Sequence, residues 1–219
     1  MQYGQTNNLL QRCTLCGQSL DKHRIKIVSD ERTDRLARQV QAALDKVAVH
    51  ARSKGFAQAK GDATMVGAAI ATIKNREYRF ATVSGRDVEV LRHMDKHSVG
   101  ADVELVKEVS YDRNEPARSY IGKLATIAGL PYVVTVAISD MGGNVFPPGA
   151  CCAPKLLMAI FRKHAAIGGE ISQIRMSEMF WKNTANGTQG KSNWSSGEAV
   201  HSCDTCKRVV PVMLCDIAE

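Results

Sequence analysis

Hydrophobic residues recur at three- and four-residue spacing between positions 30 and 53, which predicts an amphipathic helix over residues 30–53. Asp30 or Thr33 can cap the start of this helix, and Gly55 follows its end. The apolar positions are Leu36, Val40, Leu44, Val47 and Ala48.

Three later segments are typical of β-strands. In "TMVGAAIATIKNREYRFATVSG", residues 64–85, two apolar runs flank the polar "KNRE", which predicts a strand, a turn and a second strand. Residues 130–140, "LPYVVTVAISD", are rich in β-branched side chains and predict a strand. Residues 171–181, "ISQIRMSEMFW", predict a further strand.

Helices are expected between and after these strands. Residues 86–129 are charged and favour several short helices, which Pro116 interrupts. Residues 152–165 predict a helix that tolerates Pro154 in its first turn. The chain closes on a short helix through "CDTCKRVVPVML", which Pro211 limits or kinks. Strands that alternate with helices predict an α/β sandwich around a mostly buried sheet.

Composition bounds the possible partners. The chain has 219 residues, enough for one domain with a small appended module. A net charge of +7 favours an anionic partner such as nucleic acid, a nucleotide or an acidic protein, although a basic excess can also serve solubility alone. No apolar run reaches the ~18–20 residues of a membrane span, and the N-terminus lacks the pattern of a secretory signal, so neither is expected.

The seven cysteines favour metal binding over disulfides, because two pairs have the spacing Cys-x2-Cys. Cys203 and Cys206 stand at the start of a predicted helix, where the helix dipole favours thiolate. Cys151 or Cys152, at the start of another helix, can supply a third ligand. Three protein ligands and a water form a catalytic zinc arrangement.

The stretches "CCAPKLLMAI" and "HSCDTCKRVV" resemble the two zinc motifs of the cytidine deaminase-like superfamily, His/Cys-x-Glu on one helix and Pro-Cys-x-x-Cys on the next. The order of elements is similar as well, and bacterial toxin branches of the superfamily carry a motif like Cys-Ala-Glu-Pro-Lys. The resemblance covers roughly residues 35–215, and its specific part is about twenty residues. It implies a three-layer α/β fold with a mixed central sheet of about five strands flanked by helices. The chain would then divide into an N-terminal extension, residues 1–30, with a Cys-x2-Cys knuckle, and a deaminase-like domain, residues 31–219.

Aligning Pro154 and Lys155 with the Pro-Lys of the toxin motif makes Cys151 the metal ligand and leaves Cys152 in the intervening position. Ala153 then stands where the superfamily has its catalytic glutamate.

Two positions depart from the superfamily pattern. Ser202 replaces the usual proline before the pair Cys203 and Cys206, which the resemblance makes the other metal ligands. For Ala153 there are three explanations: a deliberate substitution that silences a toxic enzyme, a naturally inactive homologue, or a register shifted by one residue. We favour the first, which predicts "GACCEPKLL" in the active protein.

The resemblance implies a hydrolytic reaction. A water activated by Zn²⁺ replaces the amino group on C4 of cytosine or C6 of adenine, while the glutamate carries protons from water to the ring and to the leaving ammonia. With Ala153, the chain is expected to bind zinc and substrate without turnover.

A different assignment of the cysteines stays open. Cys13, Cys16, Cys203 and Cys206 could form one closed four-cysteine zinc site. If Cys203 and Cys206 belong to the catalytic site, Cys13 and Cys16 either are idle thiols or bind a second zinc. The further ligands of that second zinc would be drawn from His23, His50, Cys152 or Cys215.

Four residues are candidates for substrate binding. Asn144 precedes the first motif in a Gly-rich loop, where it can contact a base or can simply serve the turn. Trp194, in a hydrophilic loop, can stack on a base. His201 and Ser202 adjoin the second motif and can line the pocket, although a surface histidine is an equal alternative for His201.

The sequence therefore predicts a zinc-dependent deaminase toxin that acts on cytosine in single-stranded DNA or RNA. It would be delivered into the cytoplasm of a target cell and would bind an acidic immunity protein. A free nucleotide or adenine is the alternative substrate. A non-catalytic zinc-stabilised module that binds nucleic acid or protein is the alternative of another class.

Overall fold

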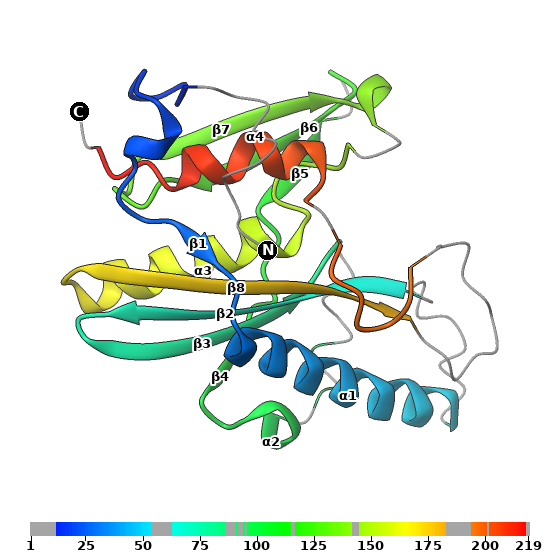
Figure 1. The fold of residues 1–219 in the computed structure, drawn as a ribbon. Helices are drawn as coiled ribbons and strands as arrows, with labels where there is room; N and C mark the ends of the chain where they lie inside the picture. Colours follow the sequence, from blue (N-terminus) through cyan, green and yellow to red (C-terminus); the bar gives the residue numbers. More distant parts are fainter. Residues whose placement is uncertain are drawn as a thin grey trace.

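A computed structural model of the chain shows helices on both faces of a central sheet, with a second, smaller sheet beside it (Figure 1). No helix among its described residues has the length and apolar character needed to cross a membrane. The structure describes residues 12–53, 63–85, 91, 94, 96–114, 117–141, 145–182, 194–200 and 202–217.

The central sheet has five strands in the order β1-β8-β2-β3-β4, which confirms the predicted mixed α/β architecture. β1 runs parallel to β8 and β3 runs parallel to β4, whereas β2 is antiparallel to both of its neighbours. The strands are β1 (Ile27–Val28), β2 (Ala63–Ile73), β3 (Arg76–Val83), β4 (Val103–Leu105) and β8 (Ile171–Lys182).

The predicted strand–turn–strand unit is the hairpin of β2 and β3. Lys74 and Asn75 form its two-residue turn, and both have positive φ, 48° and 62°. A turn of this kind matches the twist of the flanking strands. The two faces of β2 enter different cores: Ala68 and Ile70 pack toward one side, and Ala69 and Ala71 toward the other.

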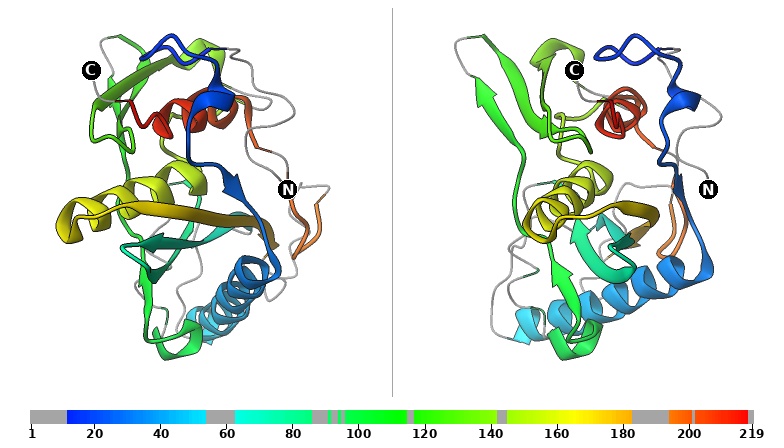
Figure 2. Two further views of the ribbon diagram at one scale, coloured as in Figure 1. Left: turned by 60° about the vertical axis from the view of Figure 1, so that its left-hand side comes forward. Right: turned by 90° about the vertical axis from the view of Figure 1, so that its left-hand side faces the viewer.

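Helix α1 (Glu31–Ser53) covers one face of the sheet and confirms the helix predicted at 30–53 (Figure 2). Leu36, Val40 and Leu44 are among its residues buried against β2 and β8. Asp30 caps its start, because its carboxylate accepts the backbone N–H groups of Arg32 and Thr33 at 3.1 and 3.0 Å. Gly55, expected to follow the helix, lies outside the described residues.

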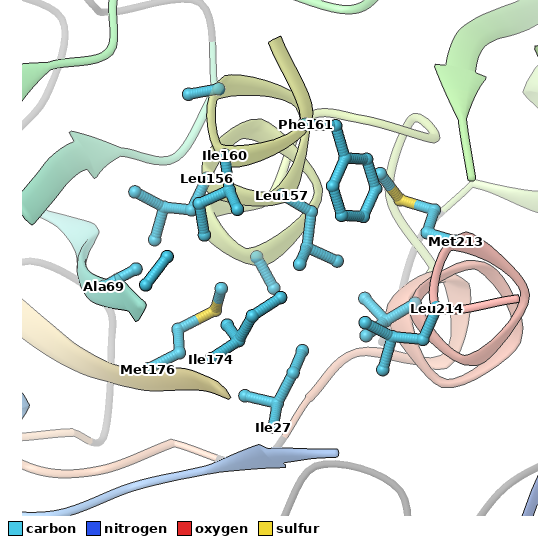
Figure 3. Close-up of a cluster of buried hydrophobic side chains, with 14 of the residues drawn as sticks. Ile27, Ala69, Leu156, Leu157, Ile160, Phe161, Ile174, Met176, Met213 and Leu214 are labelled. Carbon is cyan, nitrogen blue, oxygen red and sulfur yellow. The ribbon is translucent and has the colours of Figure 1, made fainter. Parts of the chain in front are cut away.

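Helix α3 (Cys152–Ile167) covers the opposite face, and α4 (Asp204–Met213) packs against α3. Both were predicted from the sequence. Leu157 and Phe161 of α3 extend toward Met213 and Leu214 at the end of α4, with Ile174 of β8 at the base of the same core (Figure 3). The two helices therefore share one apolar core with the sheet.

The prediction of short helices over residues 86–129 is wrong. Apart from the four-residue helix α2 (Lys96–Val99), the described part of this segment forms strands β4, β5 (Tyr111–Asn114) and β6 (Ser119–Ala125). β6 pairs with both β5 and β7 (Pro131–Ala137) in an antiparallel sheet. Such pairing overrides local preference, and periodicity within one charged segment could not reveal it. The predicted strand at 130–140 is β7; Pro116 lies outside the described residues.

Residues 12–28 contact the C-terminal end of α4 and then enter the central sheet as β1 (Figure 1). The proposed boundary at residue 30 therefore falls between a strand of the central sheet and α1. Two 3-10 turns, Leu20–Lys22 and Ile138–Asp140, complete the described elements.

Gly67 allows α3 to lie directly on β2. A Cβ atom at this position would lie 2.4 Å from Cβ of Cys152 and 3.0 Å from Cδ1 of Leu156. Glycine in a strand interior normally weakens the strand, so the close approach of the helix explains its presence.

We therefore expect Gly67→Ala to destabilise the fold by about 1–3 kcal/mol, because the added methyl group overpacks the contact between α3 and β2. Urea unfolding followed by circular dichroism measures the change. In the Cys152→Gly background, which removes the nearest opposing atom, the cost should shrink; in the Cys152→Ala background, which keeps that atom, it should persist. A Gly67→Ala chain as stable as the parent would contradict this packing argument.

Candidate metal centres

The first candidate metal centre begins at the N-terminus of α3. Cys151 is the N-cap residue, with extended backbone angles of −74° and 164°. The preceding turn is closed by a hydrogen bond from the backbone N–H of Ala150 to the carbonyl of Pro147 at 3.0 Å. The carbonyl of Ala150 accepts the N–H of Gly85 at 2.8 Å, so the end of β3 holds this turn in place. Cys151 is thus positioned by backbone contacts on both sides.

The N-terminus of α4 supplies two more sulfurs. Cys203 is the N-cap residue, and its Sγ accepts the backbone N–H of Cys206 at 3.3 Å. Thr205, between the two cysteines, donates its hydroxyl to the carbonyl of Phe146 at 2.8 Å, and its Oγ1 accepts the backbone N–H of the same residue at 3.1 Å. These two contacts fasten the loop before α3 to the first turn of α4.

Cys151, Cys203 and Cys206 consequently form one group whose sulfur atoms all lie within 4.8 Å of one another. The Sγ atoms of Cys151 and Cys203 are 3.4 Å apart. Three converging thiols are a donor set that can hold a metal ion. The structure thus brings together the three cysteines that the sequence singled out.

Hydrogen bonds among the three thiols shift their pKa values in opposite directions. Hydrogen bonds from Cys151 and Cys206 lower the pKa of Cys203 to about 3. Hydrogen bonds with Cys151 and Cys203, together with burial, raise the pKa of Cys206 well above its usual range. The hydrogen bond with Cys203 also raises the pKa of Cys151 well above its usual range. A divalent cation would relieve this arrangement by stabilising all three thiolates.

Cys152 is not part of this group. Its side chain is fully buried against β2, and its Sγ lies 3.3 Å from the carbonyl of Met65. Burial raises the pKa of Cys152 well above its usual range. Lys155, also buried, donates to the carbonyls of Val83 and Gly85. Both residues of the motif therefore fix the start of α3 against the central hairpin.

Glu178 is a neighbour that the sequence analysis missed. This residue of β8 accepts the backbone N–H of Ala153 at 3.0 Å, and its negative charge contributes to the raised pKa values of Cys151 and Cys152. The sequence of β8 contained a sign that Glu178 is unusual. Ile174 and Met176 occupy the preceding positions on the same face, so a carboxylate there interrupts an apolar row.

Ala153 lies in the first turn of α3, two residues after Cys151, and is fully buried. Its side chain belongs to the core shared by α3, α4 and the sheet. In the described structure, the carboxylate near the first group therefore comes from β8 and not from α3.

Two exposed aromatic side chains lie on the segments that precede the cysteines of this group in sequence. Phe146, 46% exposed, is the residue fastened to Thr205, and Trp194, 44% exposed, packs edge-on against Phe180 with ring centroids 5.5 Å apart. Phe180 follows Glu178 on the same face of β8. Phe146 was not singled out from the sequence, although it stands in the Gly/Pro-rich loop just before Cys151.

Of the other three residues proposed from the sequence to bind substrate, the structure describes one. Ser202 is partly buried and directly precedes Cys203. Asn144 and His201 lie outside the described residues.

A second group consists of the Cys13, Cys16 and Cys215 sulfurs and a ring nitrogen of His23, all within 4.8 Å of one another. It can hold a metal ion of its own. Cys13 and Cys16 therefore do not join Cys203 and Cys206 in one four-cysteine site, and the structure separates the two Cys-x2-Cys pairs. The side chain of His50, another candidate ligand, lies outside the described residues.

Comparisons with family models, with curated proteins and with solved structures found no match to this chain.

We expect metal affinity at the first group to fall as the pH is lowered from about 8 to about 6. Cys151 and Cys206 have raised pKa values, so both are protonated at neutral pH and must lose a proton when a metal binds. Titration with Co²⁺, followed by thiolate-to-metal absorption in a Cys16→Ser chain, isolates this group. Affinity that does not change with pH would contradict the assignment of the three thiols as ligands.

Proposed function

We propose that this chain is a zinc-dependent nucleobase deaminase in which the proton-transferring glutamate is replaced by Ala153. The observation that carries the proposal is the convergence of Cys151, Cys203 and Cys206 at the N-termini of α3 and α4. The two motif stretches whose resemblance suggested this activity are thus the two that the fold brings together.

The donor set fits zinc. Three thiols are soft ligands, and their position at two helix N-termini favours thiolate. The carboxylate of Glu178 adds negative charge beside them, which disfavours three thiolates unless a cation is present. When bound, zinc supplies a Lewis acid that activates water at neutral pH. A set of three protein ligands leaves one position for that water, as catalytic zinc sites require.

Each residue of the candidate site has its own role in this proposal. Cys151, Cys203 and Cys206 hold the metal, and Glu178 orients the first turn of α3 through the N–H of Ala153. A glutamate at position 153 would carry protons between water, the base and the leaving ammonia. The alanine provides no such group, so the chain as it stands binds a base without deaminating it.

The substrate we favour is cytosine in a single strand of DNA or RNA. Phe146 and Trp194 are exposed aromatics on the segments that precede the cysteines of the first group in sequence, and aromatic side chains stack on unpaired bases. The net charge of +7 favours a polyanion.

A toxin of this kind needs a partner that silences it in the producing cell, and an acidic protein is the partner that fits a basic chain. Delivery into the cytoplasm of a target cell belongs to the same proposal. A strong salt dependence of the affinity would identify charge as the basis of that partnership.

The direct test of the activity is Ala153→Glu. We expect it to deaminate single-stranded oligonucleotides at least ~10²–10⁴ times faster than the parent chain, because a positioned proton carrier contributes about that factor. Sequencing of DNA and RNA after brief expression would detect C-to-T or A-to-G changes and so name the base and the polymer.

Two matched variants control this experiment. Ala153→Gln has the same size but cannot exchange protons, so it should stay inactive while binding zinc equally well. Ala153→Glu combined with Cys151→Ser should lose the activity. If the Ala153→Glu chain is folded, holds zinc and deaminates nothing, the enzyme proposal fails, and retained oligonucleotide binding would then favour a non-catalytic zinc-stabilised module.

Binding can be tested on the chain without any activity. We expect Phe146→Ala and Trp194→Ala each to weaken the binding of a fluorescent single-stranded oligonucleotide by about 1–3 kcal/mol, the range measured for stacking of one base on an aromatic side chain. Fluorescence anisotropy measures the affinity. Val133→Ala is the control, because Val133 is an exposed apolar residue of β7 in the second sheet, 64% exposed. Equal effects of the three variants would contradict a role in stacking.

A further inference from the structure

The second group joins parts of the chain that are far apart in sequence. Cys13 and Cys16 come from the N-terminal turn, His23 follows the 3-10 turn Leu20–Lys22, and Cys215 follows α4. Cys13, His23 and Cys215 are buried, with 2%, 2% and 0% of their surfaces exposed. Three thiols and an imidazole gathered in this way require an explanation, because none of the thiols forms a disulfide.

The turn that holds Cys13 and Cys16 has the geometry of a metal knuckle. The backbone N–H of Gly17 donates to the carbonyl of Cys13 at 2.9 Å, and the N–H of Cys13 donates to the carbonyl of Gln18 at 2.8 Å. Gly17 has a φ of 68°, which glycine adopts without strain. The turn is therefore closed by its own backbone and keeps the two cysteines on one short loop.

The ring of His23 is oriented as a metal ligand. Its Nδ1 lies 3.1 Å from the carbonyl oxygen of Pro211, which can only accept a hydrogen bond, so Nδ1 carries the proton. Its Nε2 then presents a lone pair on the side of Cys16, whose Sγ is 3.6 Å away. Metal-ligating histidines typically donate their other ring N–H to a backbone carbonyl in this way.

The chemistry of the donors selects the metal and the role. Three thiolates and one imidazole suit zinc in a tetrahedral site. Four protein ligands fill that geometry and leave no position for water, in contrast to the first group with its three. A closed site of this kind stabilises a fold and performs no hydrolysis.

The site lies at the C-terminal end of α4, where backbone carbonyls need partners. Pro211 receives the ring of His23, and the carbonyls of Met213 and Cys215 accept the N–H groups of Ile127 and Ala128 at 2.8 and 3.3 Å. The turn between β6 and β7 and the N-terminal segment thus meet at this end. Among the described residues, the apolar cluster that surrounds the site is small: Leu20 and Val212 are the residues buried beside Cys13 and Cys215.

We propose that Cys13, Cys16, His23 and Cys215 bind a structural zinc ion that fastens the N-terminal segment to the end of α4. Because α4 carries Cys203 and Cys206 near its other end, about 15 Å away for ten residues, this ion also sets the position of the first group. The proposal does not depend on the activity proposed above.

Metal analysis of the purified chain tests the proposal by stoichiometry. The parent chain should contain two zinc ions, and Cys16→Ser, Cys151→Ser and the double variant should contain one, one and none. Cys16 is the most exposed of the three thiols in the second group, so its replacement disturbs packing least. Two zinc ions in Cys16→Ser, or one in the parent that Cys151→Ser removes, would overturn the proposal.

Stability and ligand rescue separate a metal ligand from a packed histidine. Cys16→Ser should lower the melting temperature more than Cys151→Ser, and only Cys16→Ser should make the segment before α1 sensitive to protease. His23→Cys, which retains a zinc ligand, should keep two zinc ions, whereas His23→Asn should keep one. If His23→Cys and His23→Asn lose zinc equally, His23 is not a ligand. None of these measurements uses deamination, so each stands if the proposed activity fails.

Discussion

The position of α4 is the constraint on which the candidate chemistry depends. This helix forms no part of the central sheet; it packs against α3, and its apolar side chains share one core with α3 and the sheet. Its first turn is fixed by Thr205, which grips the loop before α3, and its last turn by carbonyls that accept hydrogen bonds from two other segments. Both ends must be held for the sulfurs of Cys203 and Cys206 to meet Cys151.

Where the sequence predicted correctly, a local rule was strong enough to decide the outcome. Apolar spacing predicted α1, the polar "KNRE" predicted the central hairpin, and the cysteines at two helix starts predicted a group of thiols that could hold a metal ion. In the structure Cys152 lies against the strand at Gly67, while Cys151 lies with the two cysteines of α4. These features depend on residues that are close in sequence or on helix ends with distinctive chemistry.

Where prediction failed or stayed open, the deciding partner was distant. β6 pairs with β5 and β7, which lie apart from it along the chain, and Glu178 lies near the first group because β8 is adjacent to the start of α3. The sequence did not decide which residues would complete a metal site with Cys13 and Cys16. The structure does, because it places His23 against the end of α4, next to Cys215. The spacing of residues along the chain does not predict contacts between distant segments. The carboxylate of Glu178 in an otherwise apolar row of β8 did, however, indicate an unusual position.

The contact between the N-terminal turn at Cys13 and the segment at Cys215 affects how the protein would resist a pulling force. Cys13 and Cys215 stand near opposite ends of the described chain, and the short strand β1 that follows the knuckle is held to β8 through only two residue pairs. With an ion bound between them, tension applied to the chain before Cys13 or after Cys215 is carried by metal–ligand bonds before it reaches the sheet. Without the ion, the same tension would peel residues 12–28 away from α4 first, because so few backbone bonds resist it. The force needed to unfold the protein would therefore depend more on whether the second group holds a metal ion than on how well the hydrophobic core is packed.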